Sequence, residues 1–120
     1  MKRMMSLLLM VMMVMAACGS EETYQTIDIE DIPTKVDEGF TVLDVRETSE
    51  FEAGHIPGAS NKPLSELQQG NLEGLDSKGK YVVICQSGNR SKQASDILAK
   101  ENIEIVNVSE GMSSWTGEVE

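Results

Sequence analysis

Three short apolar runs constrain the fold more strongly than any other feature of this sequence. They are FTVLDV at 40–45, YVVIC at 81–85 and IEIVNV at 103–108, and YQTIDI at 24–29 forms a weaker fourth. Each run places apolar and β-branched residues at consecutive positions, which is typical of a strand covered on both faces. A sheet built from such runs needs helices on both of its faces.

Helical periodicity lies between these runs. Residues 90–101 place Ala94, Ile97 and Leu98 on one stripe with charged residues opposite, and residues 64–72 repeat that spacing until Gly70 interrupts it. Strands that alternate with helices predict an α/β fold with a central parallel sheet. Ligands of such sheets lie beyond the carboxyl ends of the strands, and Cys85 falls there.

Cys85 is separated by the turn QSGN from a helix that we expect to begin near Arg90. Unpaired N–H groups, the positive end of the helix and the Arg90 guanidinium all favour an anion there, and Gly88 permits the positive φ that turns N–H groups inward. The sequence therefore predicts a thiolate at Cys85 near neutral pH. The alternative is a small buried core residue at the end of a strand, as free cysteine often is.

The N-terminus has the features of an export signal. A basic pair at positions 2 and 3 precedes the apolar run LLLMVMMVM, and two alanines stand immediately before Cys18. This order is typical of a secretory signal, and the run is shorter than the about 20 residues that span a bilayer. The position of Cys18 resembles the lipobox of bacterial lipoproteins, in which this cysteine becomes the lipidated N-terminus.

We therefore expect a lipoprotein signal peptide at 1–17, a lipidated tether at 18–23 and one domain at 24–120. This organisation predicts an extracytoplasmic protein that is lipid-anchored to a bacterial membrane through Cys18. The alternative is an ordinary secreted protein in which Cys18 has no role. After lipidation of Cys18, Cys85 would be the sole thiol of an exported protein, which makes it a candidate reactive group.

Charge excludes several classes of function. Loss of the two basic leader residues leaves 8 basic residues against 20 acidic ones, a net charge of −12. Nucleic-acid binding needs clustered cations, so we expect no nucleic-acid partner. Anionic lipid would repel the domain, so attachment to a membrane would depend on acyl chains. One histidine and no cysteine pair leave too few ligands for a metal site.

Three segments in the same order resemble the rhodanese-type sulfurtransferases. CQSGNRS at 85–91 looks like their active loop, VLDVRETSEFEAGHIPGASNKP at 42–63 is similar to their Asp-Val-Arg and Gly-His-Ile-x-Gly-Ala segments, and VSEGMSSW follows at 108–115. The resemblance implies a central parallel sheet of about five strands with helices on both faces. It also implies a sulfurtransferase that moves a sulfane sulfur from a donor such as thiosulfate to cyanide or a thiol, through a Cys85 persulfide and without a cofactor.

The resemblance assigns roles residue by residue. Catalysis is assigned to Cys85, and donor binding to the loop residues Gln86, Ser87, Gly88, Asn89, Arg90 and Ser91. Backbone N–H groups of the loop would hold the charge of the persulfide, and Arg90 would orient an anionic donor. A structural role is expected for Asp44, Arg46, His55, Gly58 and Trp115. Asp44 and Arg46 would form an ion pair, His55 would belong to a turn rather than act as a base, and Trp115 would be a core aromatic on a short C-terminal helix.

Two alternatives to this enzyme remain. Phosphatases and arsenate reductases of similar architecture have a longer loop between cysteine and arginine, whereas Cys85 and Arg90 are separated by four residues. A smaller loop favours a terminal sulfur over three phosphate oxygens. The second alternative is a non-catalytic rhodanese-like module that binds a partner at the membrane surface. The intact CQSGNRS favours the enzyme, because a module without catalysis has no need of the thiol.

Overall fold

The computed structural model describes residues 23–120, and the predicted signal peptide and Cys18 lie outside this part of the chain. Five strands alternate with helices along the chain. In order, the elements are β1 (Gln25–Ile27), η2 (Ile29–Asp31), α1 (Ile32–Asp37), β2 (Thr41–Asp44), α2 (Thr48–Ala53), β3 (Ser60–Asn61), α3 (Leu64–Gln68), β4 (Lys80–Ile84), α4 (Asn89–Lys100), β5 (Glu104–Val108) and η3 (Met112–Ser114). The predicted α/β fold is confirmed.

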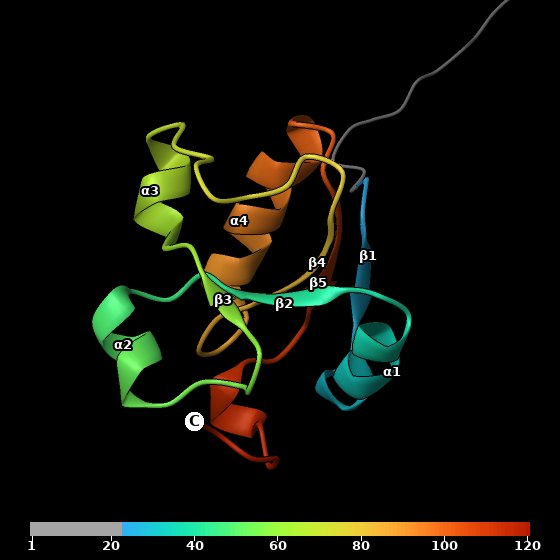
Figure 1. Cartoon of the computed structure of the whole chain (residues 1–120), viewed down its shortest axis with the longest axis vertical. Coiled ribbons are helices and arrows are strands. Elements are labelled where there is room, and N and C mark those ends of the chain that lie inside the picture. The colour runs from blue at the N-terminus through green and yellow to red at the C-terminus, as the bar shows by residue number, and fades with distance from the viewer. Residues whose placement is uncertain (1–22) are drawn as a thin grey trace, which may run out of the picture.

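The five strands form one sheet in the order β1-β5-β4-β2-β3, and every neighbouring pair is parallel. β4 lies at the centre, where Val82 pairs with Val42 of β2 and with Val106 of β5. Because all strands run in the same direction, the carboxyl ends of β2, β4 and β5, at Asp44, Ile84 and Val108, lie on the same side of the molecule (Figure 1). The residues that follow these three strands therefore meet, and Cys85 is among them.

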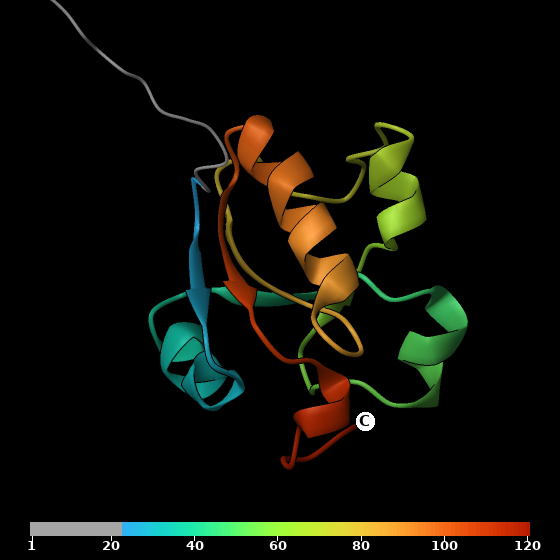
Figure 2. The same cartoon turned by 180° about the vertical axis from the view of Figure 1, so that it is seen from behind.

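Each face of the sheet has its own apolar core. Alternate residues of the segment formed by β4 and Cys85 directly after it point to opposite sides. Val83 and Cys85 belong to the cluster covered by α3 and α4, while Val82 and Ile84 belong to the cluster that contains Ile32 of α1. Figures 1 and 2 show α3 and α4 on one side of the sheet and α1 on the other. Burial of both faces explains why the strand sequences are apolar at consecutive positions.

Several boundaries and elements differ from the sequence-based expectation. β1, β2 and β5 are shorter than their apolar runs, and β4 begins and ends one residue earlier than its run. The helix predicted over 64–72 ends at Gln68, because Gly70 adopts a left-handed φ of 83°. Trp115 does not lie on a helix but directly after η3, and it is half-buried against the core rather than within it. Its indole N–H donates to the Glu118 carbonyl at 2.9 Å, so the following tail turns back over the ring.

Residues 23–120 include no helix with the length and apolar character to cross a bilayer.

Candidate active site

Cys85 follows β4 directly, and its sulfur is surrounded by the backbone of the loop that leads into α4. The N–H groups of Gly88 and Ser91 donate to Sγ at 3.1 and 3.2 Å. The residue is fully buried, with 0% of its surface exposed, and it is a free thiol. A sulfur-donor molecule therefore reaches Sγ only when the loop moves locally.

These contacts determine the charge of the sulfur. Burial raises the pKa of the Cys85 thiol, but hydrogen bonds from the backbone and hydroxyl of Ser91 and from the N–H groups of Gly88 and Ser87 lower it further than burial raises it. The net pKa is below the ordinary value of 9.0. The N–H ring thus stabilises a thiolate, because only the charged sulfur accepts several hydrogen bonds strongly.

The loop bends at Gly88, which precedes α4 with a φ of 101°. A Cβ at this position would lie 2.3 Å from the Ser109 carbonyl oxygen, so a larger residue fits neither the backbone angle nor the space. Ser91 fixes the other end of the turn, because its hydroxyl donates to the Gly88 carbonyl at 3.2 Å. Ser87 and Asn89 are exposed on the outer side of the loop.

A second segment, residues 109–113, is hydrogen-bonded to the backbone of the loop. The Met112 N–H donates to the Cys85 carbonyl at 2.8 Å and the Ser113 N–H to the Gln86 carbonyl at 3.0 Å. A Cβ on Gly111 would lie 2.3 Å from the Gln86 backbone. Figure 2 shows the loop before α4 next to the C-terminal segment, in agreement with these hydrogen bonds. The sequence motif EGMSSW indicated this segment, but not its role as the support of the loop.

Asp44 and Arg46 form the expected ion pair, and it is buried. Arg46 Nη2 lies 2.7 Å from Asp44 Oδ2, Nε also donates to that carboxylate, and the two side chains are 6% and 1% exposed. The remaining guanidinium contacts go to the Gly54 carbonyl at 2.8 Å and the Gln86 side-chain oxygen at 3.3 Å. Arg46 therefore connects the ends of β2 and α2 to the first residue after the cysteine.

Arg90 has a partner that the sequence did not indicate. Its two terminal nitrogens, Nη1 and Nη2, donate to the two carboxylate oxygens of Glu50 at 2.7 and 3.0 Å. The hydrogen bonds to Glu50 raise the pKa of Arg90 most, burial lowers it, and the charges of Glu50, Cys85 and Glu47 raise it further. The guanidinium thus lies within electrostatic reach of the sulfur while it is bound to α2.

His55 and Gly58 lie in the turn that follows α2. His55 Nδ1 donates to the Phe51 carbonyl at 2.8 Å, and its ring stacks on that of Phe51 with 3.7 Å between centroids. Its backbone exchanges two hydrogen bonds with Glu120, whose side chain also accepts from the Gly58 N–H at 3.2 Å. The imidazole thus has a structural environment, and its ring contacts within residues 23–120 are to Phe51 and Glu120 rather than to Cys85.

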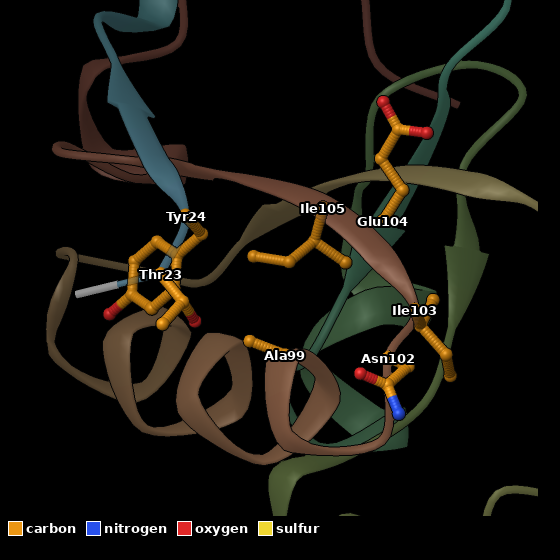
Figure 3. Close-up of a pocket in the computed structure, with 7 residues that line it drawn as sticks. All are labelled: Thr23, Tyr24, Ala99, Asn102, Ile103, Glu104 and Ile105. Atoms are coloured by element: carbon orange, nitrogen blue, oxygen red, sulfur yellow. The ribbon is translucent and has the colours of Figure 1, made fainter.

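One of the cavities in the described chain lies away from the cysteine. Figure 3 shows a hollow of about 320 Å³ that is lined by Thr23, Tyr24, Ala99, Asn102, Ile103, Glu104 and Ile105. These residues precede β1 or lie around the turn from α4 into β5, at the amino ends of the strands. Cys85 lies at the carboxyl ends of the strands, on the opposite side of the sheet from this hollow, so the chemistry of the site does not involve the hollow. No cluster of three or more potential metal ligands occurs in residues 23–120.

A family model described as the rhodanese-like domain matches residues 28–118. The chain belongs to this family. The rhodanese-like domain therefore covers both the Asp44–Arg46 pair and the Cys85 loop. The α/β fold with a five-stranded parallel sheet agrees with the solved structures that resemble it. A rhodanese-related protein from Thermoplasma volcanium is 39% identical with a TM-score of 0.69, and the match covers 77% of this chain and 90% of that one. A rhodanese-like domain protein from Staphylococcus aureus is 29% identical with a TM-score of 0.70, over 80% of this chain and 96% of that one.

Two Bacillus subtilis relatives carry names that refer to sulfur. "Putative sulfur carrier protein YrkF" is 39% identical over 97 residues, which are 78% of this chain and 52% of that protein. "Putative sulfurtransferase YtwF" is 37% identical over 84 residues, which are 70% of this chain and 81% of that protein. The chain thus spans only about half the length of the first of these relatives.

Proposed function

We propose that this rhodanese-like domain is a sulfurtransferase that carries sulfane sulfur as a persulfide on Cys85. The observation that supports this most is the pair of N–H donors at 3.1 and 3.2 Å from Sγ, which stabilise a negatively charged sulfur in a buried position. The lowered pKa of Cys85 increases the share of the nucleophile that is present as thiolate, and the same ring can hold the charge of a persulfide. Homology to proteins named as a sulfur carrier and a sulfurtransferase supports the same chemistry.

The reaction has two displacement steps. In the first, Cys85 Sγ bonds to the outer sulfur of thiosulfate, the sulfur–sulfur bond of the donor breaks, and sulfite leaves with the electron pair. In the second, cyanide or a thiolate bonds to the terminal sulfur, and Cys85 leaves as the thiolate. No external oxidant or reductant is needed, because the sulfane sulfur is transferred at constant oxidation state.

The test is intact mass measurement of a soluble form, residues 19–120, after incubation with thiosulfate. Persulfide formation adds about 32 Da, and reduction removes it. Added cyanide should then yield thiocyanate. Cys85→Ser should show neither the mass gain nor turnover, whereas Ser77→Ala, at an exposed position outside the loop, should still gain the mass. Thiocyanate formation by Cys85→Ser at the wild-type rate would refute the proposal.

Membrane attachment is a separate proposal, which rests on the sequence before residue 23. Cys18 would carry the lipid after removal of residues 1–17. The full-length protein should then partition with membranes, and Cys18→Ala should prevent lipid attachment and leave the leader uncut. Cleaved, unlipidated wild-type protein in the soluble fraction would contradict this arrangement.

A further inference from the structure

Arg90, the residue expected to receive an anionic donor, already holds an anion. Glu50 binds it through two parallel hydrogen bonds, Nη1–Oε1 at 2.7 Å and Nη2–Oε2 at 3.0 Å. This fork-to-fork geometry is the one that guanidinium adopts with an oxoanion such as sulfonate or phosphate. The two side chains are 32% and 36% exposed, so the pair is accessible to a competing anion.

Glu50 is a persistent competitor, because its carboxylate stays charged. The hydrogen bonds from Arg90 lower the pKa of Glu50 most, burial opposes them, and the Glu47 N–H and the charges of Arg90 and Arg46 lower it further, to about 2. The position of the carboxylate is also fixed within α2, because Oε1 accepts the Glu47 N–H at 3.0 Å. At neutral pH an incoming anion therefore meets an ionised, positioned carboxylate.

The second arginine beside the loop, Arg46, is also bound to a carboxylate. Arg46 donates to Asp44 through Nε and Nη2 and to Gln86 through Nη1, and it is buried. Both arginines that contact the loop or its ends thus have a carboxylate partner, and their charges are balanced before any donor arrives. A dianionic donor that approaches Arg90 from its Nη1–Nη2 side must displace Glu50.

We propose that Glu50 competes with oxoanionic donors for Arg90 and thereby selects thiol persulfides over thiosulfate as the sulfur donor. This inference rests on the proposed function of Cys85. Glu50 acts here as a specificity-determining residue and touches no reacting atom. A thiol persulfide has no sulfonate, so it can react without releasing Glu50 from Arg90.

Both donors deliver the same atom. With a thiol persulfide, Cys85 Sγ bonds to the terminal sulfur, the bond between the two donor sulfurs breaks, and the leaving thiolate takes up the proton of the donor. With thiosulfate, the bond that breaks is the one to the sulfonate sulfur, and sulfite leaves. Cys85 becomes the same persulfide anion in each case, so the initial rates can be compared directly by mass.

The experiment measures the second-order rate of mass gain with thiosulfate and with 2-hydroxyethyl persulfide, in wild type and in Glu50→Gln. Glutamine is similar in shape and still accepts the Glu47 N–H, so α2 is retained. We expect the thiosulfate rate to rise about tenfold and the rate with 2-hydroxyethyl persulfide to change less than about twofold. Glu52→Gln is the matched control, because it removes the same charge from an exposed position of the same helix.

The same pair of donors tests the dependence on Arg90. If displacement from Arg90 is the cause, Glu50→Gln should give no gain with thiosulfate in an Arg90→Gln background. A gain that persists there would mean general repulsion by the acidic surface and would overturn the inference. Equal slowing with both donors in Glu50→Gln would also overturn it, since Glu50 would then only support the loop. Absence of any mass gain in wild type with both donors would instead refute the proposed function itself.

Discussion

Two arginine–carboxylate pairs lie beside the Cys85 loop, and they differ mainly in exposure. Arg46–Asp44 is 6% and 1% exposed, and Arg90–Glu50 is 32% and 36% exposed. The shortest contact is 2.7 Å in both. The contact distances alone would therefore predict two equally strong ion pairs, whereas the difference in solvent exposure gives the pairs different roles.

Burial makes the inner pair structural. Asp44 and Arg46 cannot exchange partners with water, so loss of one leaves the other as an unpaired buried charge. In the outer pair, solvent can replace either partner, and the interaction contributes little to stability. The outer pair can therefore be displaced by a substrate, while the inner pair maintains the positions of the strand ends and of Gln86.

The largest effect is expected for Asp44→Ala. It should lower the free energy of unfolding by about 3–5 kcal/mol, because the buried guanidinium loses its counter-charge. Urea unfolding measures this loss, and Glu50→Ala is the matched comparison, with an expected loss below about 1 kcal/mol. Equal losses would show that exposure does not separate the two pairs.

Lysine substitutions of the two arginines should also reduce the free energy of unfolding more in the buried pair than in the exposed pair, but by a smaller difference. Arg46→Lys keeps the charge but cannot contact Asp44, Gly54 and Gln86 together, so we expect a loss of about 1.5–3 kcal/mol in unfolding free energy. Arg90→Lys should cost less than about 0.5 kcal/mol, because its single ammonium can still pair with Glu50. Thermal unfolding of both variants beside wild type checks the order, and a larger loss at position 90 would reverse the assignment of roles.

Much of the fold could be predicted because its strands are covered on both faces. The runs at 40–45, 81–85 and 103–108 stand out, since burial of both faces leaves no polar alternation. β3 has only two residues, Ser60 and Asn61, and neither is apolar. α2 buries no residue, so it has no apolar stripe that could be recognised. These two elements depend on tertiary contacts, and periodicity could not reveal them.

The site was predictable only in its local part. Cys85, the loop and the start of α4 follow one another in sequence, so their geometry could be inferred from order alone. The partner of Arg90 is 40 positions away. With 20 acidic residues in the chain, nothing in the sequence singled out Glu50. The contacts of Gly111 with the loop were missed for the same reason, because the two segments meet only in the fold.

Acid should weaken the outer pair in a defined range. The folded pKa of Glu50 is about 2, below the ordinary 4.5, so its stabilising contribution is complete above about pH 4.5 and is lost as the pH falls through about 2. The difference in unfolding free energy between wild type and Glu50→Gln should therefore be constant from neutral pH down to pH 4.5 and shrink below it. Urea unfolding of both proteins at neutral pH and at about pH 3 tests this. A difference that disappears already above pH 4.5 would mean that the pair does not hold the carboxylate in its charged form.

The smallest effect concerns Cys85 itself. The charge of Cys85 contributes to the raised pKa of Arg90, and this coupling is reciprocal, so the guanidinium also favours the thiolate. The Glu50 carboxylate is bound to the same guanidinium, so its negative charge opposes that influence. Glu50→Gln should therefore lower the pKa of Cys85 further, while the hydrogen bonds from Ser91 and Gly88 remain the main stabilising contacts.

The rate of iodoacetamide alkylation against pH measures this shift. In wild type the inflection should lie below that of a model thiol, and in Glu50→Gln it should lie lower still, with the plateau rate changed by less than about twofold. Glu52→Gln should leave the inflection unchanged, because Glu52 is exposed and the carboxylate that binds Arg90 is that of Glu50. A wild-type inflection at or above the model thiol would mean that the N–H ring does not stabilise an anion. A wild-type inflection that is low but unmoved in Glu50→Gln would mean that the outer pair, unlike the ring, has no electrostatic influence on the sulfur.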